Sequence, residues 1–371
     1  MRRVAIIGSG LAGMACAAKL RAEGFAGEIR MFNAEPCPPY EKPGLSKGRI
    51  GLDVPVSLVA PDLMYEAAAR SISVTERTVG TRSRIVGPFD HIVLATGRAV
   101  VRLPGFDDAV TLRTLADAQR LRLRLGGQGR VAIVGAGLIG MELAAALSQE
   151  GVPVTLVEAG PRAMMRVVPA AISDNATARM RDANVDVRFA TQLSRQVAGE
   201  LVLSDGTSIP ADVVVAAIGT HPDTDLARRA GVAVSKTGII VSPDMRASFP
   251  GIWAVGDCAT VQMADETFEC QNYAAARDMG EAAALGILGH RPDWQPNTWL
   301  WSDQGETRIE GVGQADGTHD VTDYPDGGCS VSVSRAGRLV GQFAIGSRKA
   351  LRTVRKAQSQ IMNRANEQEA V

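Results

Sequence analysis

Residues 4–13 read VAIIGSGLAG, and residues 131–140 read VAIVGAGLIG. Each stretch joins a short apolar run, typical of a parallel strand buried on both faces, to a GxGxxG pattern. In that pattern the first glycine allows a tight turn, the second lets backbone approach a pyrophosphate, and the third lets helix and strand pack closely. One match is weak evidence, but two matches 127 residues apart predict two dinucleotide-binding units in one chain.

The first unit continues in the expected order. A helix-forming stretch follows Gly13, a strand is predicted over 28–32, and Glu35 lies 22 residues beyond the last glycine. An acid at that distance is placed to accept hydrogen bonds from a ribose hydroxyl. The start of the helix offers free N–H groups and a positive dipole end to the phosphates. The predicted cofactor contacts of this unit are Gly8, Gly10, Leu11, Ala12, Gly13 and Glu35.

The second unit repeats this order, with the helix-forming stretch MELAAALSQEG and the strand VPVTLVE, which ends at Glu158. A carboxylate there bonds a ribose 2′-hydroxyl and repels a 2′-phosphate, so Glu158 favours NADH over NADPH. Arg162, four residues further on, would soften that preference. The predicted contacts of this unit are Gly135, Gly137, Leu138, Ile139, Gly140 and Glu158. Two dinucleotides held by one chain indicate FAD plus a nicotinamide cofactor, and hence an electron-transferring flavoprotein.

Composition narrows the class of protein. The formal net charge is zero, which gives no sign of nucleic-acid or membrane-surface binding. No apolar stretch is long enough to span a bilayer, and MRRVAIIGSG lacks the long apolar region of a signal peptide, so we expect a cytoplasmic protein. The scattered cysteines form no CxxC pair and predict no metal site, which fits a reducing compartment. They are Cys16, Cys37, Cys258, Cys270 and Cys329, and we expect most of them to be small buried hydrophobes.

The pattern along the 371 residues predicts an α/β protein with two Rossmann-like dinucleotide-binding domains and a C-terminal α+β domain. We expect a discontinuous FAD-binding domain over 1–105 and 231–292, with an NAD-binding domain over 106–230 between its parts. From about residue 293 the pattern changes to short alternating strands, TRIEGVG, CSVSVS and RLVGQFAI, and a closing helix is predicted from about Arg348. The C-terminal domain is therefore expected over 293–371.

Several longer motifs carry a family resemblance. They are PPYEKPGLSKG (38–48), LATGRAVVRLPG (94–105), GLIGMELAAAL (137–147), VVAAIGTHPDTDLA (214–227), IWAVGDCA (252–259) and WLWSDQGETRIEGVG (299–313). Through these motifs, nearly the whole chain resembles the FAD-dependent NADH:ferredoxin reductases of bacterial oxygenase systems, of the putidaredoxin reductase and aromatic-ring dioxygenase reductase type, in the pyridine nucleotide-disulfide oxidoreductase superfamily. The LSK and WSDQ motifs are more specific to this branch than the glycine loops are.

The resemblance implies roles for individual residues. Lys47 of LSK resembles the lysine beside the flavin ring, and Glu142 of GMEL resembles the glutamate that approaches that ring near the nicotinamide site. Asp257 of GDCA resembles the aspartate that binds the ribityl–phosphate part of FAD, and Trp301 of WSDQ resembles a tryptophan near the flavin. Further cofactor contacts are expected at Lys42, Ala95, Thr96, Gly97, Gly219, Gly256 and Tyr273.

The chain also departs from the family pattern. Lys42 stands where the family usually has arginine, which keeps the charge but loses the bidentate fork. Gln271 and Tyr273 align with a usual glutamate and tryptophan, so a charge near the flavin is missing. The segment between Gly51 and His91 is shorter than usual, and family members commonly extend further at the C-terminus.

The resemblance implies a reaction in two halves. NADH delivers a hydride to the flavin, whose reduced form is an anion that the Lys47 ammonium can stabilise while Glu142 holds that lysine in place. Electrons then leave singly to a [2Fe–2S] ferredoxin, which must be a separate protein because this chain has no cysteine cluster to ligate iron. That ferredoxin would serve an oxygenase of the P450 or Rieske type.

Two features bear on where electrons leave. Trp299 and Trp301 alternate along a presumed strand and so share one face, where they either line the flavin edge or form core aromatics. Residues 331–371 carry eight Lys or Arg and two Glu, an excess that either steers an acidic ferredoxin or is a solvated basic helix face. The oligomeric state is not readable from the sequence.

Two alternative functions stay open. Single-cysteine flavoproteins such as NADH oxidases and coenzyme A disulfide reductases place a catalytic thiol near the position of Cys37, although here a proline follows the cysteine directly. Proteins related to apoptosis-inducing factor share the expected fold, bind FAD and NADH, and act largely through slow charge-transfer complexes and partner binding.

Overall fold

The computed structural model describes residues 2–52, 63–127, 129–197, 200–264 and 266–362. The chain forms two compact units, each assembled from three separate stretches. The first unit contains residues 1–41, 55–99 and 220–297, and the second contains residues 42–54, 100–219 and 298–371.

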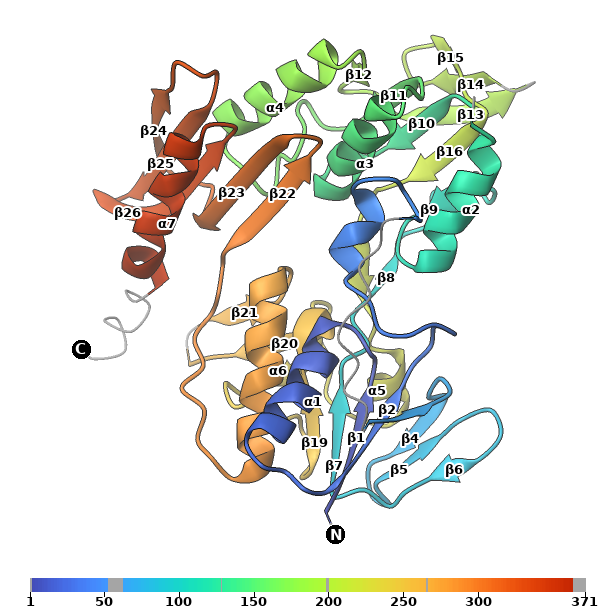
Figure 1. Ribbon diagram of the computed structural model, residues 1–371, viewed down its shortest axis with the longest axis vertical. Helices are drawn as coiled ribbons and strands as arrows, with labels where there is room; N and C mark the ends of the chain where they lie inside the picture. The colour runs from blue at the N-terminus through green and yellow to red at the C-terminus, as the bar shows by residue number, and fades with distance from the viewer. Residues whose placement is uncertain (1, 53–62, 128, 198–199, 265, 363–371) are drawn as a thin grey trace. The chain divides into compact units, whose positions relative to one another are not determined.

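The first unit is built on a parallel sheet of strand order β19-β7-β1-β2-β3. Its strands are β1 (Arg3–Ile7), β2 (Glu28–Phe32), β3 (Met64–Glu66), β7 (His91–Leu94) and β19 (Ile252–Ala254). Helices α1 (Leu11–Ala22) and α6 (Tyr273–Leu288) pack against each other (Figure 1). Their backbones approach closely, because a Cβ atom at Gly280 would lie 2.2 Å from the carbonyl oxygen of Ala12.

Smaller elements complete the first unit. They are the antiparallel sheet of β4 (Ser71–Ser73), β5 (Thr78–Gly80) and β6 (Ile85–Val86), the mixed sheet of β18 (Ile239–Val241), β20 (Ala259–Gln262) and β21 (Thr267–Glu269), the pair β8 (Arg98–Val100) and β17 (Thr220–Pro222), α5 (Asp225–Arg229) and the 3-10 turn η2 (Gly256–Cys258). Four of the five cysteines are buried, as expected, and Cys37 is half-buried.

The second unit contains a parallel sheet of order β12-β11-β10-β16-β9. Its strands are β9 (Val110–Thr111), β10 (Val131–Val134), β11 (Val154–Val157), β12 (Asp186–Arg188) and β16 (Val213–Ala216). With it belong α2 (Leu115–Leu125), α3 (Leu138–Gln149), α4 (Ala170–Asp182), the 3-10 turn η1 (Lys42–Ser46) and an antiparallel sheet of β13 (Leu193–Val197), β14 (Glu200–Leu203) and β15 (Ser208–Pro210). The turn η1 contacts α3.

The same unit carries an antiparallel C-terminal sheet of order β22-β23-β26-β25-β24. Its strands are β22 (Leu300–Gln304), β23 (Thr307–Gly313), β24 (Thr318–Asp323), β25 (Cys329–Arg335) and β26 (Arg338–Ile345). Helix α7 (Arg348–Met362) covers one face, where Val312 and Ala344 pack against Ala350 and Val354. Strand β22 contacts α3, while β25 and β26 contact α4.

The predicted fold class is confirmed. The strands expected over 28–32, 131–134, 307–313 and 338–345 form with those bounds, and α7 begins at Arg348. The hairpins of β13 to β15 and the strand β24 were not expected. The three-domain division stays a prediction, and the shortened segment between Gly51 and His91 lies partly outside the described residues. Among the described residues, no helix is both long enough and apolar enough to cross a bilayer.

Candidate functional site

The first glycine loop joins β1 to α1. Gly8 has φ +114°, and a Cβ there would lie 2.1 Å from the carbonyl oxygen of Ala95. A Cβ at Gly13 would lie 2.2 Å from the carbonyl oxygen of Gly8. A Cβ at Gly10, in contrast, meets no described heavy atom within 4 Å. Gly8 and Gly13 are therefore required by the fold itself, whereas Gly10 leaves a face of backbone open to a ligand.

The second loop, between β10 and α3, has the same construction. Gly135 has φ +103°, and a Cβ there would lie 2.5 Å from the carbonyl oxygen of Ala217. A Cβ at Gly140 would lie 1.9 Å from the carbonyl oxygen of Gly135. Around Gly137 no described heavy atom lies within 4 Å of the added carbon. Two loops with one open glycine each are what two pyrophosphate groups require.

The helices behind these loops begin without side-chain caps. Gly10 and Gly137 are the N-cap residues of α1 and α3, and neither provides a side-chain hydrogen bond. By comparison, Thr114 caps α2 with a complete capping box, and Asn272 caps α6 through Ala275 N–H. The first N–H groups of a helix need partners, and phosphate oxygens supply them well. The residues present thus fit a dinucleotide at each loop.

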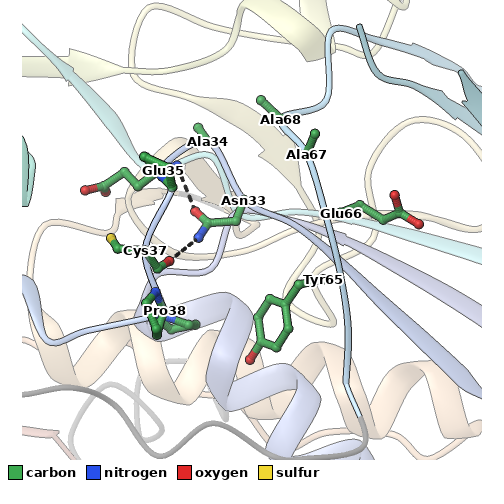
Figure 2. Close-up of a pocket in the computed structure, with 11 residues that line it drawn as sticks. Asn33, Ala34, Glu35, Cys37, Pro38, Tyr65, Glu66, Ala67 and Ala68 are labelled. Atoms are coloured by element: carbon green, nitrogen blue, oxygen red, sulfur yellow. Dashed lines mark hydrogen bonds between the residues drawn. The ribbon is translucent and has the colours of Figure 1, made fainter. Parts of the chain in front are cut away.

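A cavity of about 610 Å³ lies beside the ends of β2 and β3 in the first unit (Figure 2). It is lined by residues 33–39 and 65–68. The Asn33 side chain ties its own loop together, because Oδ1 accepts from Glu35 N–H at 3.0 Å and Nδ2 donates to the Cys37 carbonyl at 2.9 Å. The Glu35 carboxylate extends away from Tyr65 (Figure 2) and accepts a hydrogen bond from Tyr40 Oη at 2.6 Å. The volume suits a nucleoside-sized group.

Other predicted contacts of the first unit lie near α1. Ala95, Thr96 and Gly97 follow β7, and Thr96 Oγ1 donates to the Asp223 carbonyl. Asp257 lies in η2, where a Cβ at Gly256 would be 2.7 Å from Ala12 Cβ.

The departures from the family pattern lie at the start of α6. Tyr273 is the first residue of that helix, and its hydroxyl donates to Glu41 Oε1 at 3.2 Å. The Gln271 amide donates to Glu269 Oε2 at 3.0 Å. The hydroxyl of Tyr273 and the amide of Gln271 therefore each bond a carboxylate in this unit.

Glu158 holds the second glycine loop. Its Oε2 accepts from Ala136 N–H at 2.8 Å, and its Oε1 accepts from Gly160 N–H at 2.7 Å. Two backbone donors fix this carboxylate in place at the end of β11. That location is the one expected for ribose recognition.

Arg162 is turned to its own loop. Its Nη1 donates to the Val168 carbonyl at 3.0 Å, and its Nη2 donates to the Met165 carbonyl at 3.0 Å. From its place in the sequence, we expected this arginine to soften the preference for NADH. In the structure its guanidinium is committed to two carbonyl oxygens of residues 165–168.

Lys47 and Glu142 meet in the second unit, as the two motifs predicted. Lys47 Nζ lies 3.5 Å from Glu142 Oε1 and 3.1 Å from Asp303 Oδ2. The Glu142 side chain is only 8% exposed and also accepts hydrogen bonds from Ser46 Oγ and, at 2.8 Å, from Ser302 Oγ. An ammonium group thus sits between a buried and a half-buried carboxylate.

Burial raises the pKa of the Glu142 carboxyl above its ordinary value, while the Lys47 ammonium and the Ser46 hydroxyl oppose that shift. The proton affinity of this carboxyl therefore depends on where the ammonium lies.

Two tryptophans lie beside this pair. The rings of Trp299 and Trp301 are stacked, with centroids 5.0 Å apart and an interplanar angle of 23°. Lys47 Nζ lies 5.3 Å from the centroid of the Trp301 ring. The predicted shared face is confirmed, although β22 begins at Leu300, one residue after Trp299.

The remaining predicted contacts also lie in the second unit. Lys42 is the first residue of η1, and its Nζ donates to the Arg113 carbonyl at 3.3 Å. Gly219 follows β16 with φ +111°, and its carbonyl accepts from Val101 N–H at 3.0 Å. Three residues of this site were not predicted, although all of them stand inside the LSK and WSDQ motifs: Ser46, Ser302 and Asp303.

Comparison with known proteins identifies the family of this chain. Residues 2–280 match the family described as pyridine nucleotide-disulphide oxidoreductase, and residues 299–370 match the one described as reductase C-terminal. The chain belongs to the pyridine nucleotide-disulphide oxidoreductase family. It is therefore an oxidoreductase of a family that uses FAD and NAD(H).

Three relatives are informative. Putidaredoxin reductase CamA of Pseudomonas putida is 33% identical over 341 residues, which cover 85% of this chain and 81% of that protein. The ferredoxin–NAD(+) reductase component of the p-cumate 2,3-dioxygenase system of Pseudomonas putida is 33% identical over 330 residues, which cover 84% of this chain and 81% of that protein. The structure of a covalent putidaredoxin reductase–putidaredoxin complex matches with a TM-score of 0.89 and 28% identity, covering 98% of this chain and 93% of that one.

Proposed function

We propose that this chain is an NADH-dependent flavoprotein reductase that passes electrons from FAD, one at a time, to a [2Fe–2S] ferredoxin serving an oxygenase. The observation that carries the proposal is the pair of glycine loops, each with one open glycine and an uncapped helix behind it. Two relatives, each matched by this chain over 81% of its length, are named as reductases of putidaredoxin and of ferredoxin. The likeness to these two reductases supports ferredoxin as the electron acceptor, and the two glycine loops support the binding of FAD and NADH.

In the first unit, the proposed FAD contacts begin at the phosphate loop. The N–H groups at the start of α1 would bond the pyrophosphate beside Gly10, and the cavity next to Glu35 would take the adenosine part. Asp257, at the N-terminal side of α6, would bond the ribityl–phosphate part. When bound, FAD accepts a hydride and releases electrons singly.

In the second unit, the proposed nicotinamide cofactor is NADH. Glu158 is fixed at the end of β11, where it would bond the ribose 2′-hydroxyl and repel a 2′-phosphate. Arg162 donates from Nη1 and Nη2 to two carbonyls of its own loop, which restricts the freedom of its guanidinium to reach a 2′-phosphate. Both observations support discrimination against NADPH.

Lys47 and Glu142 would act on charge during the reaction. The ammonium of Lys47 would stabilise negative charge that develops on the flavin ring, and Glu142 would hold that ammonium in place. Because Glu142 is buried and its pKa is raised, its charge is sensitive to the charges near it. Trp301, stacked on Trp299, would cover the side where electrons leave.

Helix α7 offers a surface for an acidic acceptor. Its exposed side chains include Arg348, Lys349, Arg352, Arg355 and Lys356, and the helix contains no Asp or Glu between Arg348 and Met362. Such a surface attracts an acidic partner and raises the association rate at low ionic strength. We propose that the ferredoxin docks against this helix. A cytoplasmic location stays a prediction.

Reconstitution tests the function. Purified protein, NADH, a [2Fe–2S] ferredoxin and cytochrome c as the reporter should give cytochrome reduction that depends on the ferredoxin. The Lys356→Glu variant should raise the KM for ferredoxin at low salt, whereas Lys236→Glu, an exposed lysine in the first unit, should leave it unchanged. Cytochrome reduction that is equally fast without ferredoxin would contradict the assigned acceptor.

A further inference from the structure

Glu310 is a carboxylate on β23 with 0% exposure, on the sheet face that α7 covers. Its register partner on β26 is Ala344, which belongs to the core beneath that helix. Oε1 accepts from Arg308 Nε at 2.8 Å and lies 3.5 Å from Arg355 Nη2. Oε2 is buried as well, and among the described residues it has no hydrogen-bond partner.

Core stability does not account for this residue. Removing a carboxylate from water is unfavourable, and a buried ion pair offsets that penalty only with well-satisfied geometry. Here one of the two oxygens of Glu310 has no partner among the residues described. An apolar side chain of similar volume would pack as well, so the charge points to something that it holds in place.

Of its two arginine partners, Glu310 lies closer to Arg308, at 2.8 Å, than to Arg355, at 3.5 Å. The guanidinium of Arg308 donates from Nε to Glu310 Oε1 at 2.8 Å and from Nη1 to Asp303 Oδ1 at 2.9 Å. The two bonds come from different edges of a planar group, so together they fix its orientation. The side chain of Arg308 is 37% exposed, and without the inner bond it would be held at one end only.

Arg308 in turn borders the predicted electron-transfer residues. Its guanidinium carbon lies 6.0 Å from the centroid of the Trp301 ring. Asp303 is shared, since Oδ1 accepts from Arg308 while Oδ2 lies 3.1 Å from Lys47 Nζ. Trp301 and Glu310 are register partners across β22 and β23, as are Asp303 and Arg308. A row of alternating charges therefore runs from the buried carboxylate to the ammonium.

We propose that Glu310 is a positioning residue for the site of Lys47 and Trp301. Its buried carboxylate holds Arg308 beside the Trp301 ring and against Asp303, and Asp303 then sets the position of the Lys47 ammonium. The effect of the Lys47 position on turnover rests on the proposed function. The geometric effect of Glu310 on Trp301 does not rest on it.

The geometric effect is measured by circular dichroism, with and without FAD. Two stacked indoles give a paired far-ultraviolet signal that depends on the distance and angle between the rings, and Trp301→Phe defines its size. In Glu310→Gln we expect this signal to fall toward that of Trp301→Phe. Glu306→Gln removes the same charge from an exposed site on the same hairpin, and it should keep the wild-type signal.

The catalytic effect is measured as NADH-dependent ferricyanide reduction. We expect Glu310→Gln to lower kcat about fivefold, equivalent to about 1 kcal/mol, with the KM for NADH within about twofold of wild type. Glu306→Gln should match wild type in both. If Glu310→Gln does not fold, Arg308→Gln, whose side chain is partly exposed, should show the same two changes.

If folded Glu310→Gln keeps the wild-type tryptophan signal or the wild-type kcat, the proposal is overturned. A lower melting temperature with the tryptophan signal and kcat unchanged also overturns it, because the role of Glu310 would then be structural. If the wild-type protein itself is not reduced by NADH, the proposed function fails. The tryptophan signal still decides whether Glu310 positions Trp301.

Discussion

The second glycine loop allows a substitution that separates binding from folding. Gly137→Ala adds a carbon that meets no described heavy atom within 4 Å, at a residue whose φ of −73° suits alanine. Gly140→Ala adds a carbon 1.9 Å from the carbonyl oxygen of Gly135. The two substitutions are chemically identical and lie three residues apart. The first should weaken NAD⁺ binding, and the second should lower the stability of the fold.

For Gly137→Ala we expect the loss to appear in NAD⁺ affinity. The added methyl group occupies the backbone face where the pyrophosphate is proposed to lie, and one charge-assisted hydrogen bond is worth about 1.5–3 kcal/mol. NAD⁺ should therefore bind about 10- to 150-fold more weakly. The free energy of unfolding should change by about 0.5 kcal/mol or less, because lost N-cap preference and reduced chain entropy offset each other.

For Gly140→Ala we expect the loss to appear in stability. Helix and strand must separate to admit the methyl group, which costs about 3 kcal/mol and lowers Tm by about 5–10 °C. Titration calorimetry with NAD⁺ and thermal melting followed by circular dichroism measure the two effects, and retained FAD absorbance confirms that the first unit is intact. If Gly137→Ala binds NAD⁺ like wild type, or if Gly140→Ala melts like wild type, the assignment of roles within the loop is wrong.

Three further predictions follow from single side chains. Cys37→Ser should leave ferredoxin-dependent turnover unchanged, whereas a collapse of activity would favour a single-cysteine flavoenzyme. Lys47→Met should lower kcat for NADH oxidation about 10²-fold with little change in KM, because the ammonium acts on charge that develops during the reaction; an unchanged kcat would remove Lys47 from the site. Burial lowers the pKa of His91, whose Nδ1 accepts from Trp253 Nε1 at 3.2 Å. Its stabilising contribution is complete above the unfolded pKa of about 6.5 and is lost as pH falls, so Tm should drop below about pH 6.5 more in wild type than in His91→Gln.

The glycine loops could be predicted from sequence because their constraints are local. A strand, three glycines and a helix follow one another within ten residues, and the acids at Glu35 and Glu158 lie at a fixed distance beyond them. The pairing of Lys47 with Glu142 joins residues 95 positions apart, and only the family motifs suggested it.

The environment of Glu310 could not be predicted in the same way. In TRIEGVG, polar Arg308 and Glu310 alternate with Ile309, which indicates that their face meets solvent. Helix α7 covers part of that face instead, and Glu310 becomes fully buried. The network from Glu310 to Lys47 depends on the register between β22 and β23, which no local pattern specifies.

An anaerobic titration of the purified protein with NADH tests the central claim most directly. The account predicts a yellow protein whose flavin absorbance is bleached by one NADH per FAD and by NADPH far more slowly, and whose colour returns when oxidised [2Fe–2S] ferredoxin is added. A protein that takes up no FAD on incubation, or whose bound flavin keeps its absorbance in excess NADH, would contradict it.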